Sequence, residues 1–286
     1  MYATPVWLWK GTHTMSDQPF EGQRVVITGG GTGIGKHAAV EFAKLGAASV
    51  IITGRRKERL DEVAELHPNI VPVAADVTTA EGAQAVADAV ETNGAKLDVL
   101  VHNAGIFRNT LAEYFDEKAS NDLLNINLLG PVRLTSALYQ YLSKPGGNIV
   151  FVSSVAGHNP EPGAALYAAS KAGMHSLTLT WARELAPLGI RVNAVAPAGV
   201  RTEVYAANGL NDEETDAIFA TLADIMPLGR TGTVEDITPW ITLLASPASS
   251  WVTGQIITID GGQDLTAGTD HLFLSWFRSR LEGDAA

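Results

Sequence analysis

Three side chains near the middle of the chain have types and spacing suited to proton transfer. Tyr167 and Lys171 are four residues apart in AALYAASKAGMHSLTLTWARELA, a run with helical periodicity and few breakers, so they share one helix face. Ser154 lies thirteen residues before Tyr167 and ends the apolar strand-like run NIVFVSS. In open α/β sheets, ligands bind beyond the carboxyl ends of strands. A phenol beside an ammonium, with a hydroxyl facing both, can pass a proton to or from a carbonyl oxygen.

The charge of Lys171 predicts a lowered pKa for the Tyr167 phenol. A free tyrosine titrates near ~10, too high for efficient acid–base catalysis at neutral pH. An ammonium about 4 Å away would contribute roughly 4 kcal/mol, enough to lower the pKa by up to about three pH units, although desolvation of the phenolate opposes this. Taken alone, Y-x-x-x-K also describes an ordinary helix tyrosine beside a surface lysine. The assignment therefore depends on the surrounding elements.

Composition restricts the class of protein. The 286 residues are 46% hydrophobic and 18% charged, which is typical of a soluble globular protein with a substantial core. The net charge of −11 argues against nonspecific binding to nucleic acid or to anionic membranes. No cysteine is present, which excludes disulfides, zinc–thiolate sites and cysteine nucleophiles and is compatible with a cytoplasmic location. We assign no metal site, and no apolar run is long enough to predict a transmembrane helix.

Apolar strand patterns alternate with amphipathic helix patterns along most of the chain. The strand patterns are RVVITG, SVIITG, NIVPVAAD, LDVLVHNAG, NIVFVSS, GIRVNAVAP and GQIITID, and one long helix is expected around Glu117–Leu142. This alternation predicts the α/β class, as one doubly wound (Rossmann) seven-stranded parallel sheet with helices on both faces. We expect a single domain over residues 23–264, with an N-terminal extension over 1–22 and a C-terminal tail over 265–286. Residues 1–14 are interpreted as an upstream start or added extension, or alternatively as an arm packed on a neighbouring subunit.

A glycine-rich turn, TGGGTGIG, separates the first strand from the first helix. The spacing G-x-G-x-x-G does not fit it, whereas G-x-x-x-G-x-G fits with Gly29, Gly33 and Gly35. Glycines here allow a sharp turn and a close approach to a pyrophosphate, which the N-terminus of the following helix attracts. The turn therefore predicts a dinucleotide coenzyme.

The end of the second strand indicates which coenzyme binds. Folds that bind NAD place a carboxylate there to hold the ribose 2′-hydroxyl, but this chain has Thr53-Gly54-Arg55-Arg56. Two guanidinium groups suit a 2′-phosphate, so we predict NADP. The alternative is that RRKER is only the solvated start of a helix.

With these features assembled, the chain resembles the short-chain dehydrogenase/reductase family in its short single-domain form. The resemblance covers about residues 23–262, and its character is closest to 3-oxoacyl-carrier-protein reductases and related carbonyl reductases. Many separate motifs occur in the family's order and spacing. They are TGGGTGIG, Asp76-Val77, Asn103-Ala104-Gly105, NINL with Asn127, Ser154, Y-A-A-S-K, GIRVNAVAP and TGQIITIDGG.

The resemblance implies roles for four catalytic residues. Tyr167 would be the general acid in reduction or the base in oxidation. Lys171 would lower the pKa of Tyr167 and also hold the nicotinamide ribose. Ser154 would hold the substrate oxygen, and Asn127 would hold a water that links Lys171 to solvent.

The resemblance also implies coenzyme contacts in addition to Tyr167, Lys171, Arg55 and Arg56. One departure concerns the loop after the sixth strand, where the family usually has Pro-Gly and this chain has Pro197-Ala198-Gly199. Alanine resists positive φ, so either φ is negative at Ala198 or Gly199 absorbs the turn. The implied contacts are Gly29, Thr32, Gly33, Ile34 and Gly35 for the pyrophosphate and nicotinamide side, Asp76 and Val77 for adenine, Asn103, Ala104 and Gly105 for the adjacent ribose, and Pro197, Val200 and Thr202 for the nicotinamide.

These assignments predict an NADP(H)-dependent oxidoreductase acting on a ketone, an aldehyde or a secondary alcohol. One alternative is an NAD(P)-dependent alcohol dehydrogenase working oxidatively, and another is a catalytically silent NADP(H)-binding protein. The expected partner is a small-molecule substrate, with no nucleic acid and no membrane.

Residues 201–227 occupy the place of the family's substrate lid. Their apolar helix face either packs on the domain or covers an apolar substrate. Five of their acidic residues, Asp212, Glu213, Glu214, Asp216 and Asp224, would repel an acidic acyl carrier protein. In the tail, a second apolar helix face predicts packing on a neighbouring subunit of a homotetramer. The lid face comprises Ile218, Phe219, Leu222, Ile225 and Met226, and the tail face comprises Leu272, Phe273, Trp276, Phe277 and Leu281.

Overall fold

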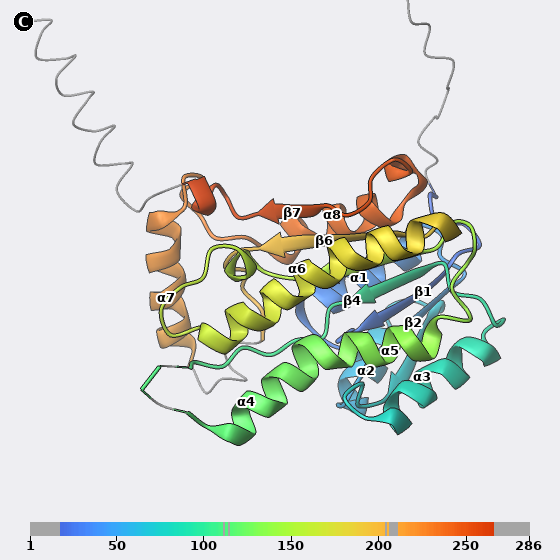
Figure 1. The fold of residues 1–286 in the computed structure, drawn as a ribbon, viewed down its shortest axis with the longest axis horizontal. Helices are drawn as coiled ribbons and strands as arrows, with labels where there is room; N and C mark the ends of the chain where they lie inside the picture. Colours follow the sequence, from blue (N-terminus) through green and yellow to red (C-terminus); the bar gives the residue numbers. More distant parts are fainter. Residues whose placement is uncertain (1–17, 111, 114, 204, 206–210, 266–286) are drawn as a thin grey trace, which may run out of the picture.

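A seven-stranded, fully parallel sheet forms the centre of the molecule (Figure 1). The computed structural model describes residues 18–265 except 111, 114, 204 and 206–210. The spatial order is β3-β2-β1-β4-β5-β6-β7, and each neighbouring pair is parallel. The predicted doubly wound sheet is confirmed. The strands are β1 (Arg24–Thr28), β2 (Ser49–Gly54), β3 (Ile70–Ala74), β4 (Val99–His102), β5 (Asn148–Val152), β6 (Arg191–Pro197) and β7 (Ile256–Ile259).

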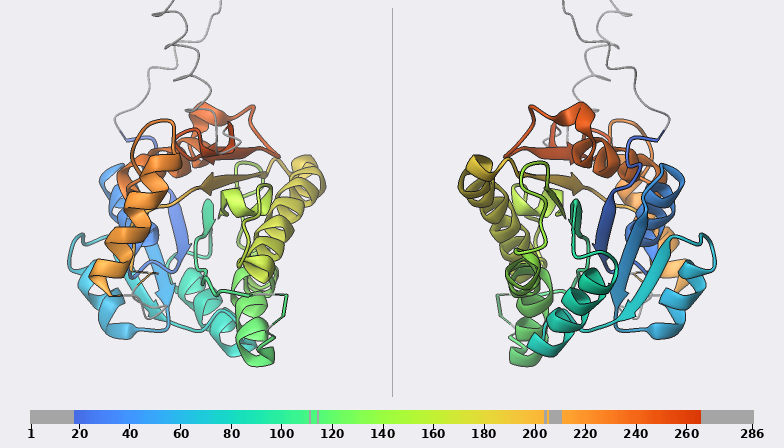
Figure 2. Two further views of the ribbon diagram at one scale, coloured as in Figure 1. Left: turned by 90° about the vertical axis from the view of Figure 1, so that its left-hand side faces the viewer. Right: turned by 90° about the vertical axis from the view of Figure 1, so that its right-hand side faces the viewer.

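Helices cover both faces of the sheet (Figure 2). Helices α1, α2 and α8 pack on one face, and α3, α5 and α6 pack on the other. No helix in the described part of the chain combines the length and apolarity needed to cross a membrane. The α-helices are α1 (Gly33–Lys44), α2 (Lys57–Ala64), α3 (Ala80–Thr92), α4 (Glu117–Leu124), α5 (Gly130–Leu138), α6 (Ala165–Leu185), α7 (Asp212–Ile225) and α8 (Val234–Ala245). Short helices are η1 (Asn125–Leu129), η2 (Val155–Gly157), η3 (Ala186–Leu188), η5 (Pro247–Ser249) and η6 (Gln263–Leu265).

The core consists of two apolar layers, one on each side of the sheet. Along β1, Val25 and Ile27 join the layer that contains Phe42 of α1, whereas Val26 joins the opposite layer with Leu134 of α5. Successive side chains of a strand point to opposite faces, and here both faces are covered. The strands therefore read as continuous apolar runs rather than alternating ones.

The long helix expected around Glu117–Leu142 is not continuous. Helix α4 ends at Leu124, a π-helical turn follows over Asn125–Leu129, and α5 ends at Leu138. Pro131 in the first turn of α5 has no N–H to donate to the carbonyl of Asn127, which loosens the α-helical ladder at this point. Such π turns inside helices are frequent at functional sites, and this one contains Asn127.

The packed part of the chain begins before β1. Phe20 is fully buried, and its ring meets that of Phe42 edge-on with centroids 4.7 Å apart. Its backbone N–H also donates to the carbonyl of Leu45 at 3.1 Å. Residues just ahead of position 23, where we placed the start of the domain, therefore contribute to its core.

Candidate active site

The order of the strands creates a crevice beside β1 and β4. From β1 the chain adds β2 and β3 on one side, and from β4 it adds β5, β6 and β7 on the other. Open α/β sheets bind ligands at such a reversal, beyond the carboxyl ends of the strands. The glycine-rich turn follows β1, and the Asn103-Ala104-Gly105 turn follows β4. The crevice thus brings together two of the motifs identified in the sequence.

The glycine-rich turn has the close backbone contacts that its spacing predicts. Gly29 and Gly33 have φ of +67° and +53°, which favours glycine at both positions. A Cβ on Gly35 would lie only 2.3 Å from the carbonyl oxygen of Gly29. Helix α1 begins at Gly33, and its N-cap Thr32 makes no side-chain capping hydrogen bond. A helix N-terminus behind a bare glycine turn fits the pyrophosphate of a dinucleotide.

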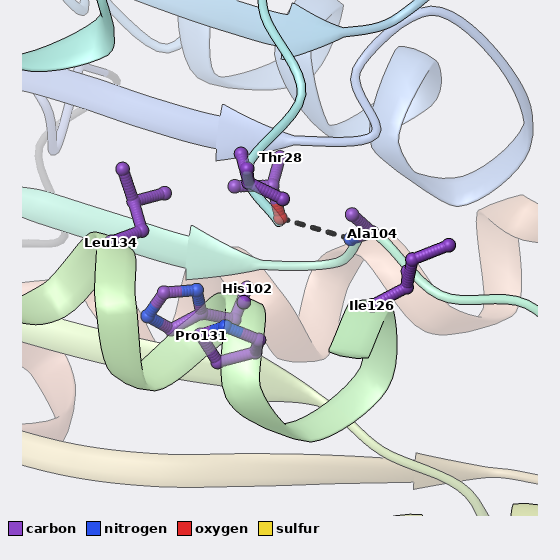
Figure 3. A pocket seen from close by; sticks show the side chains of 8 residues that line it. Thr28, His102, Ala104, Ile126, Pro131 and Leu134 are labelled. Atoms are coloured by element: carbon purple, nitrogen blue, oxygen red, sulfur yellow. Dashed lines mark hydrogen bonds between the residues drawn. The ribbon is translucent and has the colours of Figure 1, made fainter. Parts of the chain in front are cut away.

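Asn103 holds β4 against this turn. Its Nδ2 donates to the carbonyl oxygens of Thr28 and Gly29 at 2.9 and 3.1 Å, so both amide hydrogens are used within the protein. The N–H of Ala104 donates to Thr28 Oγ1 at 2.9 Å (Figure 3). Val77 and Ala104, both implied as coenzyme contacts, line one small pocket here. The pocket is lined by Thr28, Val77, His102, Ala104, Ile126, Gly130, Pro131 and Leu134.

The two arginines after β2 lie where the sequence places a 2′-phosphate. Arg56 is the N-cap residue of α2, and its Nη2 is 3.7 Å from Glu203 Oε2. Arg55 acts on Asp76. Burial raises the pKa of Asp76, but hydrogen bonds from Thr78 and the charge of Arg55 outweigh burial and hold this pKa below its usual value. Exposed guanidinium groups at a strand end have the chemistry that a phosphate requires.

Lys171 is almost fully buried at the carboxyl end of β5. Its side chain comes from α6, and its Nζ donates to the carbonyl oxygen of Val152 at 3.0 Å. The residue is only 4% exposed, and this burial lowers the pKa of Lys171 to about 8. A Cβ on Gly105 would lie 3.6 Å from Nζ. The glycine of the β4 turn therefore leaves space directly beside the ammonium.

The Tyr167 phenol has a raised pKa rather than a lowered one. Burial raises it, and a hydrogen bond with Ser154 opposes this only in part. Lys171 Nζ is 5.6 Å from the centre of the Tyr167 ring and hydrogen-bonds Val152 instead. The predicted lowering by Lys171 is therefore wrong for this structure, because the ammonium is bonded to Val152 and desolvation of the phenolate outweighs the hydrogen bond with Ser154.

Ser154 lies two residues beyond the end of β5, as its strand-end position predicts. It is the N-cap residue of η2, and its Oγ accepts a hydrogen bond from the N–H of Ala156 at 3.2 Å. This bond fixes the side chain while leaving its O–H hydrogen free to donate. Ser154 and Tyr167 are thus brought together from a strand end and a helix start.

Asn127 is completely buried inside the π turn. Its Oδ1 accepts from the N–H of Ile106 at 2.8 Å, and its Nδ2 donates to the carbonyl of Ile106 at 2.9 Å and to Ser170 Oγ at 3.1 Å. Ser170 Oγ in turn donates to the carbonyl of Tyr167 at 2.7 Å. Asn127 therefore connects the β4 turn to the first turn of α6, and it joins the other three predicted catalytic residues.

The loop after β6 resolves the question of Ala198. Ala95 is the only non-glycine residue with positive φ in the part of the chain that the structure describes, and Gly199 is not among the glycines with positive φ. Neither residue needs a left-handed turn. A Cβ on Gly199 would instead lie 2.8 Å from Leu222 Cδ1 of α7. Further along, Thr202 packs over the glycine turn, 3.1 Å from a Cβ built on Gly33.

Two aromatic residues that sequence reasoning did not select, Phe107 and Tyr205, lie near the phenol. The Phe107 ring meets that of Tyr167 edge-on, with centroids 5.1 Å apart, and Tyr205 meets Phe219 of α7 at 4.9 Å. Burial, with smaller effects from Tyr167 and Glu161, raises the pKa of Tyr205 to about 12. The position of Phe107, two residues after the Asn-Ala-Gly turn, was the available signal. Phe219 and Met226 of the expected lid face are buried, whereas Ile225 is exposed.

The loop between Ser154 and Tyr167 is tied to the segment after β7. His158 Nε2 contacts Asp264 Oδ2, Asn159 Nδ2 donates to Asp264 Oδ1 at 3.0 Å, and Gln263 Nε2 donates to Glu161 Oε1 at 2.9 Å. These contacts fix the loop that joins Ser154 to Tyr167. Within the described residues, neither this cluster nor any other group of three or more His, Cys, Asp or Glu side chains is arranged to hold a metal ion.

Known proteins resemble the chain over nearly all of this fold. A family model described as enoyl-(acyl carrier protein) reductase matches residues 29–264. The 3-oxoacyl-[acyl-carrier-protein] reductase of Thermotoga maritima is 40% identical over 247 residues, which are 85% of this chain and 98% of the relative.

Two solved structures extend the comparison. A short-chain dehydrogenase/reductase of unknown function from Caenorhabditis elegans, solved with cofactor, has a TM-score of 0.82 at 35% identity and covers 88% of this chain and 98% of its own. The 3-ketoacyl-(acyl-carrier-protein) reductase of Brucella melitensis, complexed with NADH, has a TM-score of 0.78 at 31% identity, covering 85% and 99%. Matches of this extent leave one conclusion: the chain belongs to the short-chain dehydrogenase/reductase family of oxidoreductases.

Proposed function

We propose that this protein is an NADP(H)-dependent oxidoreductase that transfers a hydride between nicotinamide and a ketone or aldehyde, or a secondary alcohol in reverse. The observation that carries the proposal is the buried Lys171 ammonium beside Tyr167 and Ser154. Burying a lysine costs free energy, and a protein that only bound the coenzyme would have no use for all three groups together. A catalytically silent role is therefore disfavoured.

The residues of the chain divide the work in reduction. A bound nicotinamide coenzyme supplies the hydride to the carbonyl carbon. Ser154 donates a hydrogen bond to the carbonyl oxygen and stabilises the charge that develops there. Tyr167 transfers its phenolic proton to the same oxygen, and its raised pKa keeps it protonated at neutral pH. Lys171 stabilises the resulting phenolate. Asn127 fixes the backbone of Ile106 and, through Ser170, the turn of α6 next to Lys171. Water that reaches Lys171 would restore the proton.

Replacement of the phenol tests this mechanism. Tyr167→Phe removes only the transferable proton, so kcat should fall by about 10²–10⁴-fold while binding of NADPH stays close to that of the parent. Tyr141→Phe, which removes a hydroxyl that donates to Glu91 on the surface, is the matched control and should retain full activity. Retention of more than about a tenth of the parental kcat by Tyr167→Phe would contradict a general-acid role.

The preference for NADP rests on Arg55 and Arg56. Loss of one charge-assisted contact to a 2′-phosphate costs roughly 1.5–3 kcal/mol, so Arg55→Ala should lower kcat/KM for NADPH and leave that for NADH nearly unchanged. The Brucella relative was solved with NADH, which makes the direct comparison of both coenzymes essential. A parent enzyme that prefers NADH would overturn the assignment.

The walls of the site favour an apolar, uncharged substrate. Phe107 packs against Tyr167, and Tyr205 packs against Phe219 of α7. Helix α7 opens with three consecutive acidic residues, Asp212–Glu214. Those charges would repel an acidic carrier protein. Two relatives are nevertheless named as reductases of acyl-carrier-protein substrates. Screening carbonyl compounds by NADPH absorbance, with an acyl-carrier-protein substrate beside free apolar ketones, distinguishes the two classes.

We also propose a homotetramer, in a cytoplasmic enzyme. Two separate parts of the surface expose large apolar side chains. Leu129, Tyr139 and Leu179 are exposed on η1, the end of α5 and α6, and Trp251, 98% exposed, lies in the segment before β7. Large exposed apolar patches commonly mark interfaces, and two of them on one chain suit two kinds of two-fold contact. Light scattering measures the mass, and a monomer at micromolar concentration would refute the proposal.

A further inference from the structure

The arginine cluster at the end of β2 is opposed by a carboxylate from a distant part of the chain. Glu203 follows β6, and its Oε2 lies 3.7 Å from Arg56 Nη2. The same carboxylate also raises the pKa of Arg59, after the larger effects of Glu62. Arg59 lies against the glycine turn, since a Cβ on Gly31 would come within 3.3 Å of its Cβ. Glu203 therefore acts on two guanidinium groups at the edge of the coenzyme crevice.

The position of Glu203 follows from that of its neighbour. Thr202 packs over Gly33 in the glycine turn, so the next residue is carried across the crevice toward α2. The side chains of Arg56 and Glu203 remain 56% and 49% exposed. An exposed ion pair of this kind contributes little to stability. The relevant property of Glu203 is its position, because a carboxylate beside the arginines also lies beside any anion that they bind.

We propose that Glu203 is a specificity-determining residue that weakens binding of the 2′-phosphate and so moderates the preference of this enzyme for NADPH over NADH. The proposal rests on the proposed role of Arg56 in holding that phosphate. A carboxylate beside Arg56 competes with the phosphate for the guanidinium and repels its charge. NADH has an uncharged 2′-hydroxyl at this position, so neither the competition nor the repulsion affects its binding.

The expected size of the effect is modest. Two unit charges about 6 Å apart in water interact strongly enough to change an equilibrium constant about threefold, and a dianionic phosphate squares that factor to about tenfold. Glu203→Gln keeps the shape of the side chain and removes its charge. It should therefore tighten NADPH binding by about three- to tenfold and leave NADH binding unchanged. Because both charges are exposed, the gain should shrink markedly between 0.1 M and 1 M salt.

Coenzyme dissociation constants, measured by calorimetry or by fluorescence of the bound nicotinamide, test the proposal without any substrate. The set comprises the parent, Glu203→Gln, Arg56→Ala and the control Glu65→Gln. Glu65 is exposed at the other end of α2, about 13 Å from Arg56 by helix rise, and its replacement makes the same change in net charge. Tighter NADPH binding in Glu203→Gln alone, with NADH unaffected, is the expected result.

Each other outcome has a distinct meaning. Equal changes for NADPH and NADH, weaker NADPH binding, or an equal gain in Glu65→Gln would overturn the proposal for Glu203. If Arg56→Ala leaves the ratio of NADPH to NADH affinity unchanged, the role of Arg56 itself fails, which is a separate failure of the proposed function. If Arg56→Ala lowers that ratio while Glu203→Gln does nothing, NADP specificity stands and only the moderating role of Glu203 is refuted.

Discussion

Replacing Lys171 with methionine should stabilise the folded chain while abolishing turnover. Burial lowers the pKa of Lys171 from 10.5 to about 8. This gap of about 2.5 pH units, at about 1.36 kcal/mol each, means that the buried ammonium costs about 3 kcal/mol at neutral pH. Methionine keeps an unbranched apolar stem without the charge. The lost hydrogen bond to the Val152 carbonyl would cost about 1 kcal/mol, so a net gain of about 2 kcal/mol remains.

The pH dependence identifies the cause of this gain. Below pH 8, Lys171 is protonated in the folded and the unfolded chain, and the parent bears the full cost of burial. Between pH 8 and 10.5 the unfolded chain binds a proton that the folded chain has released, so parental stability rises with pH. Linkage raises parental stability by about 2.5 kcal/mol between pH 7 and pH 10, so the advantage of Lys171→Met should be gone, or slightly reversed, at pH 10.

Urea unfolding at one protein concentration, at pH 7 and pH 10, measures both quantities. Lys118→Met, which replaces an exposed lysine paired with Asp122, controls for the substitution itself and should change stability little at either pH. A variant at position 171 that is less stable than the parent at pH 7, or whose advantage is the same at both pH values, would refute the reasoning.

Three other predictions concern stability and the tail. Thr79→Ala removes the side-chain cap that accepts from the N–H of Gly82 and should lower the free energy of unfolding by about 1 kcal/mol in urea. Burial raises the pKa of Asp98, but hydrogen bonds from Lys96 and Ser143 outweigh burial and hold this pKa low. The ionised Asp98 therefore stabilises the folded chain above its unfolded pKa, and this contribution is lost as pH falls below about 4. Asp98→Asn should accordingly lose less of its free energy of unfolding than the parent between pH 5 and pH 2, as measured by unfolding monitored with circular dichroism. The tail helix face lies outside the described residues. Truncation at Gly268 should reduce the number of subunits per particle, measured by light scattering, or change KM.

Features that depend on local sequence could be predicted. The glycine spacing selected Gly29, Gly33 and Gly35, because each must satisfy a steric condition within one short turn. The strand runs were recognisable because both faces of a parallel sheet are apolar. The spacing of Tyr167 and Lys171 placed both on α6, since the helical repeat alone fixes that geometry.

Features that depend on distant contacts could not. The raised pKa of Tyr167 reflects burial by residues such as Phe107, and no local pattern reports how completely a side chain will be covered. The π turn around Asn127 could not be predicted either. Proline in the first turn of a helix is common, and its presence does not by itself indicate that a π turn precedes it. The pair of Arg56 and Glu203 joins segments whose proximity is set only by the order of the strands.

The opposite pKa shifts of Lys171 and Tyr167 have one cause, and together they favour the proposed reaction. Burial disfavours an isolated ammonium, which lowers the pKa of Lys171, and it disfavours an isolated phenolate, which raises the pKa of Tyr167. When Tyr167 gives its proton to a substrate oxygen, the phenolate is left beside an ammonium that lies 5.6 Å from the centre of its ring, and charges attract most strongly where the dielectric is low. The same burial that makes each charge unfavourable in the resting site therefore makes their pairing most effective at the moment of proton transfer, which is when stabilisation increases the rate.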